Sequence, residues 1–420
     1  MIQNSTMDTC PFDLAIIGGG PAGTAAALEA RRHGLQVAVW ERSRFPRHKV
    51  CGEFISAESL PVLQQEIPAA LARSAVIRRA EFVAQSGRPY RFTLPSAARG
   101  LSRLVMDEAM WRAAIRSGAQ AHEGTAIRRV GRSAGLRTSG VRRPDTGAWG
   151  NFSFSLAAAL SDRRLWEVQP AKGDSRITRA VLVASGRWWS LGGFPSPSQD
   201  GRAAGPWLGA KAHFTGVTPD DAVEMYFFPG GYCGLAPIED GLFNVCCLVH
   251  RSLTGSVSAE GLADFALWLR RVARHPALDL RLRGATQVSG TIATAPVQPM
   301  RRRADHSGAL LAGDAAGFLD PFTGDGISQA LYAGRLAAET VAQACRGDRE
   351  SLALAAEAYR RRLRRAVGAS YRVAALLRLL VRAPGGLQQL AATLLSAFAP
   401  RLVTETRWHG SEAVEGSRAE

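Results

Sequence analysis

The stretch Gly18-Gly19-Gly20-Pro21-Ala22-Gly23 decides the fold of this 420-residue chain. Residues 12–17 before it are apolar, as in a buried strand, and residues 21–33 after it are rich in alanine at helical spacing. A second strand is expected over residues 36–40, and an acid, Glu41, follows it directly. This order of strand, glycine turn, helix, strand and acid predicts a unit that binds a dinucleotide.

Each conspicuous residue of this unit has a separate physical task. Gly18 permits the tight turn, Gly20 lets a pyrophosphate approach the backbone, and Gly23 lets the helix pack close to the sheet. The phosphates would lie on free N–H groups at the positive end of the helix dipole. Glu41 would accept hydrogen bonds from the adenosine ribose, and its charge disfavours NADP at this position.

A second glycine-rich segment lies almost 300 residues later. Gly313-Asp314 follows an apolar strand expected over residues 309–312, and Asp314 can accept a hydrogen bond from a ribityl chain. A turn containing Gly324 then feeds a long helix expected over residues 326–345, whose N-terminus would face and stabilise a reduced isoalloxazine ring. Two such segments in this order predict one long cofactor held at both ends, which is FAD.

The segment from Gly313 to Ile327, GDAAGFLDPFTGDGI, resembles the glutathione-reductase-type flavoproteins. Within that family it is similar to the branch of aromatic hydroxylases, flavin halogenases and geranylgeranyl reductases. Gly317 stands where hydroxylases usually carry histidine, so the reductase version is the most similar. Residues 44–53, RFPRHKVCGE, resemble the P-x-x-K-x-CG segment of those reductases, and Leu101-Ser102-Arg103 resembles a third flavin contact.

The resemblance implies a set of cofactor contacts. Arg103 would cover the cofactor, and the full set of expected FAD contacts is Gly18, Gly20, Pro21, Ala22, Gly23, Glu41, Arg42, Cys51, Gly52, Arg103, Gly313, Asp314, Gly324, Gly326 and Ile327.

Two motifs depart from the family pattern. Hydroxylases carry an Asp-Gly pair where this chain has Ala184-Ser185-Gly186, which weakens the case for tight NAD(P)H recognition there. The reductase motif YxWxFP corresponds to residues 232–237, YCGLAP, so small residues replace large aromatic ones. Tyr232, Gly234 and Pro237 are the expected substrate-lining residues, in a cavity that the small side chains would widen.

The expected fold class is α/β, a Rossmann-like FAD-binding domain with an inserted antiparallel β-sheet substrate domain and a C-terminal helical tail. Short β-rich runs between residues 210 and 250, separated by glycine turns, predict the inserted sheet. The predicted boundaries are 1–80, 100–188 and 286–350 for the FAD-binding domain, 81–99 and 189–285 for the substrate domain, and 351–420 for the helical region.

Several polar residues are candidates for the chemistry. Cys51 and Lys211 are the candidate catalytic residues, although Cys51 has an equally good interpretation as a small packed side chain. Lys49 and Glu53 are either site residues or a solvated loop pair. We expect one of Lys211 and His213 to face the flavin.

Other residues favour packing over chemistry. Cys246-Cys247 is best explained as core, and Trp188-Trp189 as a cover for the sheet. The six cysteines show no CxxC spacing, so we expect neither a metal site nor a disulfide framework. Scattered cysteines of this kind favour a reducing, cytoplasmic location. The N-terminus has neither the basic nor the apolar region of a signal peptide, and no apolar run is long enough to form a transmembrane segment.

The net charge of +16 comes almost entirely from arginines spread along the chain. No basic motif interleaved with aromatic residues occurs, so no nucleic-acid partner is expected. The local concentration at Arg360, Arg361, Arg362, Arg364 and Arg365 suggests peripheral contact with anionic lipid or an acidic carrier, or a solvated helix face.

The sequence therefore predicts an FAD-dependent oxidoreductase that receives electrons from NAD(P)H or a reduced partner. The first hypothesis is a geranylgeranyl-reductase-like enzyme that reduces C=C bonds of an apolar, biosynthetic or carrier-bound small molecule. The alternative is a monooxygenase, a hydroxylase acting through a C4a-flavin peroxide. A flavin-binding module without catalysis is the remaining class.

Overall fold

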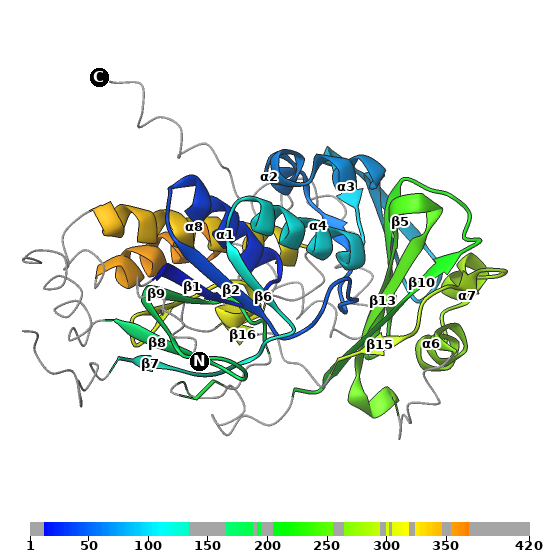
Figure 1. The fold of residues 1–420 in the computed structure, drawn as a ribbon. Helices are drawn as coiled ribbons and strands as arrows, with labels where there is room; N and C mark the ends of the chain where they lie inside the picture. Colours follow the sequence, from blue (N-terminus) through cyan, green and yellow to red (C-terminus); the bar gives the residue numbers. More distant parts are fainter. Residues whose placement is uncertain are drawn as a thin grey trace, which may run out of the picture.

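The computed structural model describes residues 12–133, 165–187, 191–192, 194, 205–254, 264–294, 300–301, 305–318, 324–346 and 354–368. Within these ranges the chain forms two large sheets, which lie side by side in Figure 1. Residues 135–155, whose Gly, Arg and Ser content predicts a loop or irregular strand, lie outside the described residues. So do Trp188-Trp189, Pro321 and most of the predicted helical tail.

The first sheet holds the glycine-rich segments. Its described strands are β1 (Phe12–Ile17), β2 (Val37–Glu41), β6 (Gln120–Glu123), β7 (Ile127–Arg132), β8 (Trp166–Pro170), β9 (Arg176–Val183), β17 (Asp305–His306) and β18 (Ala309–Leu311). The strands β6, β2, β1, β9 and β18 are neighbours in this order and run parallel. The strands β7 and β8 extend from β9 as an antiparallel branch.

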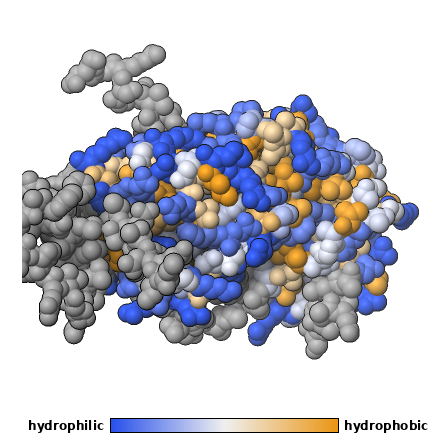
Figure 2. Space-filling view, viewed as in Figure 1, coloured by the Kyte–Doolittle hydropathy of each residue, from blue (hydrophilic) through white to orange (hydrophobic). Residues whose placement is uncertain are grey.

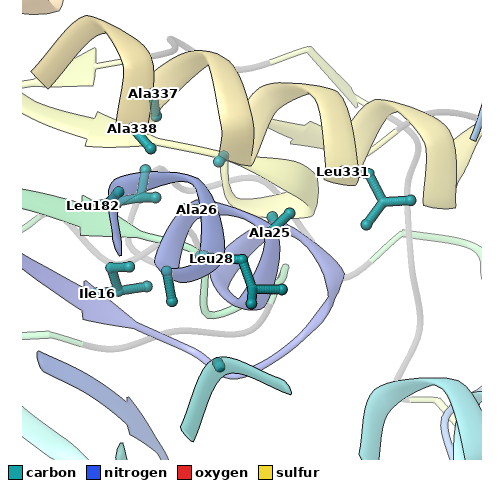
Figure 3. Packing of buried hydrophobic residues seen from close by; sticks show 14 of the residues in the cluster. Ile16, Ala25, Ala26, Leu28, Leu182, Leu331, Ala337 and Ala338 are labelled. Carbon is teal, nitrogen blue, oxygen red and sulfur yellow. The ribbon is translucent and has the colours of Figure 1, made fainter. Parts of the chain in front are cut away.

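Helices cover one face of this parallel sheet, and its β7–β8 branch folds over the other face. The described α-helices are α1 (Pro21–Arg32), α2 (Leu60–Glu66), α3 (Pro68–Arg73), α4 (Arg103–Arg116), α6 (Phe265–Ala273), α7 (Pro276–Arg281) and α8 (Gly326–Arg346). Residues such as Ile16 and Leu182 point from the strands toward α1, and Ala337 and Ala338 of α8 pack beside them (Figure 3). The alternate strand positions, such as Val183, face β7 and β8 instead.

The alanine and glycine content of α1 and α8 has a packing reason. A Cβ at Gly334 of α8 would lie 2.0 Å from the carbonyl oxygen of Ala22 in α1, so only glycine fits at this crossing. The two helices therefore approach closely, which brings the second glycine-rich segment next to the first. Residues 354–368 are also helical, and the buried Tyr359 hydroxyl donates a hydrogen bond of 2.8 Å to the carbonyl of Leu311.

The second sheet is the expected antiparallel one. Its described strands are β3 (Phe54–Ile55), β4 (Ala75–Val83), β5 (Pro89–Gly100), β10 (Trp207–Thr215), β11 (Ala222–Phe228), β12 (Gly231–Pro237), β13 (Phe243–His250), β14 (Thr286–Gln287) and β15 (Ile292–Ala293). The one parallel pair among them is β4 with β11. A two-stranded ribbon of β16 (Met300–Arg301) and β19 (Gly317–Phe318) completes the described strands.

The predicted domain boundaries stay a prediction, but the second sheet draws on more of the early chain than they assume. Strand β4 begins at Ala75 and β3 at Phe54, both within the range assigned to the FAD-binding domain. The outer face of this sheet packs against α6 and α7, which lie at the right of Figure 1. Its other face carries the residues described next.

Candidate active site

The carboxyl ends of the parallel strands bring three loops to one edge of the first sheet. Gly18 directly follows β1, Ala184 directly follows β9, and Gly313 lies two residues after the end of β18. Gly18 has a φ of 112°, and a Cβ there would lie 2.3 Å from the carbonyl oxygen of Ala184. A Cβ at Gly313 would touch that of Ala22 at 3.3 Å. The two glycine-rich segments predicted to hold one cofactor are thus adjacent.

The first loop has the openness that a pyrophosphate requires. A Cβ at Gly23 would lie 1.8 Å from the carbonyl oxygen of Gly18, so Gly23 is needed for packing. At Gly20 the nearest heavy atom to such a Cβ is a guanidinium nitrogen of Arg103, 3.9 Å away. Gly20 is also the N-cap of α1 and offers no side-chain cap to the first turn. The backbone here is open toward Arg103, as expected for a bound anion.

Glu41 is held by the protein in a way the sequence did not indicate. One carboxylate oxygen accepts the Gly19 N–H at 2.9 Å and the other accepts the Ser43 N–H at 2.9 Å. Burial alone would raise the pKa of Glu41, but Arg47 and these two amides outweigh it and hold the pKa below its ordinary value. Glu41 therefore stays ionised and can accept further hydrogen bonds from ribose hydroxyls.

Arg47 was not among the predicted cofactor contacts, yet its guanidinium lies beside Glu41. Its guanidinium donates to Glu41 at 3.1 Å and lies 3.6 Å from Asp107. Among the described residues, its Nε and Nη1 atoms are buried without a hydrogen-bond partner. Unsatisfied buried donors beside an open phosphate loop fit an anionic ligand such as the FAD pyrophosphate.

Arg103 begins α4 and faces the same loop. Its guanidinium binds Asp107 through two hydrogen bonds, of 2.6 and 2.8 Å. Burial would lower its pKa, but Asp107 outweighs this and raises it, so the cation is permanent. Arg42, by contrast, is exposed beyond the end of β2.

The second glycine-rich segment presents Asp314 and the start of α8. The Asp314 carboxylate lies 3.4 Å from Nε of Arg187, which follows β9 and stacks on the ring of Phe318 at 3.9 Å. Gly324 has a φ of 71°, and a Cβ there would lie 3.0 Å from Phe54. The side chain of Ile327 is buried in the core.

The segment Cys51–Ser56 joins the start of α8 to the second sheet. The Ser56 hydroxyl hydrogen-bonds that of Ser328 in α8. On the other side, Nδ2 of Asn244 in β13 donates to the carbonyl of Cys51 at 3.0 Å. Gly52 is exposed, whereas Glu53 is fully buried with a φ of 58°. This segment thus lies where the predicted flavin ring and the second sheet meet.

Glu53 is the centre of a buried polar cluster. The interpretation of Lys49 and Glu53 as a solvated loop pair is therefore wrong for Glu53. Its carboxylate forms an ion pair with Lys211 and a hydrogen bond of 2.7 Å with His213 Nε2. It also accepts a hydrogen bond of 2.8 Å from the backbone N–H of Arg103. Burial would raise the pKa of Glu53, but hydrogen bonding to His213 and the charge of Lys211 outweigh it and lower the pKa.

The expectation that only one of Lys211 and His213 points inward is also wrong. Positions 211 and 213 are two apart on β10, so alternation puts both side chains on the same face of the sheet. Both residue numbers are odd, and this shared parity was the signal that could have placed Lys211 and His213 on one face. Lys49 is half-buried, and burial followed by the charge of Arg47 lowers its pKa to about 8.

The strand register defines the whole inward face. Lys211 pairs with Cys246, which pairs with Gly234, which pairs with Met225, so these four share one face. Tyr232 and Leu248 lie on the same face and pack with Phe318, with Trp207, Met225 and Phe227 beside them. The inward face is therefore polar at the Glu53 end and apolar and aromatic at the other.

The predicted substrate-lining residues do not all belong to this face. Tyr232 and Gly234 do, but Pro237 pairs with Phe243, which packs on the opposite face under α6 and α7. A Cβ at Gly234 would lie 3.2 Å from the sulfur of Met225, so the thioether lies over this small residue. Cys246 is on the inward face and Cys247 in the outer core, so the packing interpretation holds for Cys247.

A membrane-spanning helix requires a long and mostly apolar run of residues. Hydrophilic residues cover most of the described part of the face in Figure 2, with hydrophobic residues gathered mainly toward the half that carries the second sheet. None of the helices in the described ranges combines the length and apolar character needed to span a bilayer. Of the basic concentration, Arg361 lies 3.9 Å from Glu357 and Arg362 3.5 Å from Glu339.

Comparison with known proteins agrees with this architecture. The model of the family "Pyridine nucleotide-disulphide oxidoreductase" matches residues 12–80. Digeranylgeranylglycerophospholipid reductase 2 of Methanopyrus kandleri is 29% identical over 80% of this chain and 78% of its own length. The flavin-dependent halogenase armH1 of Armillaria mellea is 25% identical over 80% of this chain and 66% of its own length.

A solved structure supports the same fold. The flavin-dependent brominase Bmp2 superposes with a TM-score of 0.71 at 19% identity, covering 95% of each chain. The expected FAD-binding scaffold and the expected kinship are thus confirmed. The chain is thus similar to FAD-dependent oxidoreductases of the branch that holds the geranylgeranyl reductases and the flavin-dependent halogenases.

Proposed function

We propose that this protein reduces C=C bonds of a long apolar substrate of isoprenoid type, with FAD that receives its electrons from NAD(P)H. The observation that carries the proposal is the inward face of the second sheet. It combines a buried proton-holding cluster at Glu53 with an aromatic, apolar stretch around Tyr232 and Phe318.

The two halves of this face match the two demands of the reaction. An apolar chain is stabilised by burial against side chains such as Tyr232, Leu248 and Phe227. Saturating a C=C bond also requires a hydride and a proton. FAD supplies the hydride when it is bound, and the protein must position the substrate and hold the proton.

The residues present fit FAD at the edge of the first sheet. Gly20 and the first turn of α1 would bind the pyrophosphate, with Arg47 and Arg103 as cationic neighbours. Glu41 would bind the adenosine ribose, and Asp314 the ribityl chain. The N-terminus of α8 would face the ring, next to the Cys51–Ser56 segment.

Anaerobic turnover tests the reductase proposal. Protein loaded with FAD is reduced with NADH, NADPH or dithionite, mixed with geranylgeranyl diphosphate, and the product is analysed by mass spectrometry. A gain of two hydrogens per reduced double bond, together with reoxidation of the flavin, is expected. Reduced protein that leaves the alkene unchanged would count against the proposal.

A second candidate function is oxygen-dependent modification of an aromatic substrate, by hydroxylation or halogenation. The similarity to the brominase over 95% of each chain favours it. The same preparation separates the two, because this reaction needs oxygen and, for halogenation, a halide. Products that form from an indole or phenol only in air would support the second candidate.

A further inference from the structure

Four titratable side chains form a continuous path from the half-buried segment before Cys51 to the buried inward face. The rings of His48 and His213 pack edge to face, with centroids 5.1 Å apart. His213 Nε2 lies 2.7 Å from a Glu53 oxygen and 3.0 Å from Lys211 Nζ. Lys211, His213 and Glu53 are at most 4% exposed, whereas His48 is half-buried.

The geometry at His213 Nε2 suits two protonation states. When this nitrogen carries a proton, it donates to Glu53, and when it carries a lone pair, it accepts from the Lys211 ammonium. Nε2 thus keeps a hydrogen-bond partner whether its proton is present or absent. A cluster with this property can take up and release one proton without moving its side chains.

His48 is suited to connect the cluster with solvent. Its Nδ1 atom is buried and has no hydrogen-bond partner among the described residues. Burial, followed by the positive charges of Lys211 and His213, lowers its pKa, so the ring is neutral at neutral pH and can accept a proton. The edge-to-face packing of this half-buried ring on His213 places it next to the cluster.

We propose that His48, His213, Glu53 and Lys211 form a proton relay that delivers the second hydrogen of the C=C reduction as a proton. This inference rests on the proposed reductase function. Reduction of one double bond adds a hydride, supplied by NAD(P)H by way of FAD, to one carbon. The electron pair of the broken π bond forms the second C–H bond with a proton from the cluster, and water restores that proton through His48.

Other charged or titratable groups surround the relay and must be held constant in a test. On β13, Cys246 faces Lys211 and Glu53, and the connection between β12 and β13 contributes Glu239. Cys51 lies between His48 and Glu53 in the chain. On α4, Arg103 pairs with Asp107, and the backbone N–H of Arg103 donates to Glu53. Burial raises the pKa of Cys246, so this thiol is protonated and does not compete for the relay proton.

Proton uptake on reduction tests the cluster without any substrate. FAD-loaded protein is photoreduced anaerobically in weak buffer with an indicator dye, and protons taken up per FAD are counted. His213→Asn and Glu53→Gln should take up fewer protons than the wild type, by up to about one per FAD. An unchanged count in both variants would overturn the relay.

A matched control lies on the opposite face of the same sheet. Arg281→Met removes a cation from a partly buried ion pair with Glu224, at 2.8 Å, without touching the inward face. Its proton count should equal that of the wild type. A loss in this variant equal to that of His213→Asn would show a general effect of sheet destabilisation and would contradict the proposal.

His48→Asn provides a kinetic test that leaves the cluster intact. Since Nδ1 has no hydrogen-bond partner among the described residues, the fold should be unaffected and the proton count unchanged. Reduction of geranylgeranyl diphosphate should become slower, with a larger solvent isotope effect and partial rescue by imidazole. Wild-type rate and isotope effect in this variant would refute the path. If the wild-type protein reduces no alkene, the proposed function fails, and the proton count still decides the cluster's role.

Discussion

Glu53 and His213 are 160 positions apart in the chain, yet Oε2 of one and Nε2 of the other lie 2.7 Å apart in a buried contact. Because Glu53 also accepts the backbone N–H of Arg103, one carboxylate connects the second sheet to the helix that faces the phosphate loop. The orientation of Arg103 and the position of the inward face therefore depend on the same residue.

Glu53→Gln should destabilise the protein by about 3–5 kcal/mol at neutral pH, because Lys211 would remain buried without its counter-charge. The pKa of Glu53 is below 4.5 in the folded protein, so the folded state binds fewer protons than the unfolded chain. Its contribution is present above about pH 4.5 and is lost as the pH falls through the lowered pKa. Urea unfolding of both proteins from neutral to acidic pH measures this. A gap between them that widens on acidification would disagree with the assignment.

Substitution by alanine at two glycines of the first loop should affect different properties, stability at Gly23 and FAD affinity at Gly20. Gly23→Ala places a Cβ against the Gly18 carbonyl and should lower the free energy of unfolding by about 1–3 kcal/mol or more, with or without FAD. Gly20→Ala meets no close neighbour, so the apoprotein should unfold at the wild-type temperature while FAD binds roughly tenfold more weakly. Thermal unfolding and flavin titration of the two variants separate the effects. Equal FAD affinity in Gly20→Ala and the wild type would place the pyrophosphate elsewhere.

Asp314→Ala should weaken FAD binding by about tenfold to a hundredfold, the cost of losing a hydrogen bond to a charged group. The carboxylate is 35% exposed and its described ion pair is with Arg187, so little stability should be lost. Arg187→Met is the matched control, since it removes the ion pair and leaves the carboxylate. Flavin content after gel filtration is the readout. Full retention of flavin in Asp314→Ala would remove this residue from the site.

Lys49 should make stability rise with pH in the alkaline range. Its pKa is about 8 in the folded protein and near 10.5 when unfolded, so between these values the unfolded chain binds more protons. The stability of the apoprotein relative to Lys49→Met should therefore increase from about pH 8 to 10.5. Lys172→Met, at an exposed position, controls for loss of a charge. A relative stability that is flat over this range would contradict the burial of the ammonium.

The sequence predicted the parts of the fold that local rules govern. The β1–α1–β2 unit, the strand before Gly313 and the long helix after it were found where apolar periodicity and glycine placed them. The β-rich runs predicted between residues 210 and 250 correspond to β10, β11, β12 and β13, because Gly230-Gly231 and Asp240-Gly241 supply clear turns. Membership of β4 in that sheet was not evident, since its pairing with β11 joins residues about 140 apart.

The site was harder to predict, for a physical reason. The chemistry of Glu53 depends on His213 and Lys211, which only the tertiary fold brings to it. Likewise, the Arg47 donors that lack a partner within the described part of the chain follow from how its segment packs against Asp107, and no motif encodes that. Side-chain parity on β10 was the one signal available in advance.

Equilibrium titration with FAD is the decisive measurement, since both glycine-rich segments are assigned to one cofactor. We expect one FAD per chain, with quenched flavin fluorescence, displacement by excess ADP through the Glu41 side, and weaker binding in Asp314→Ala. Flavin fluorescence that stays at the value of free FAD, at protein in excess and with the fold intact by circular dichroism, would contradict this assignment.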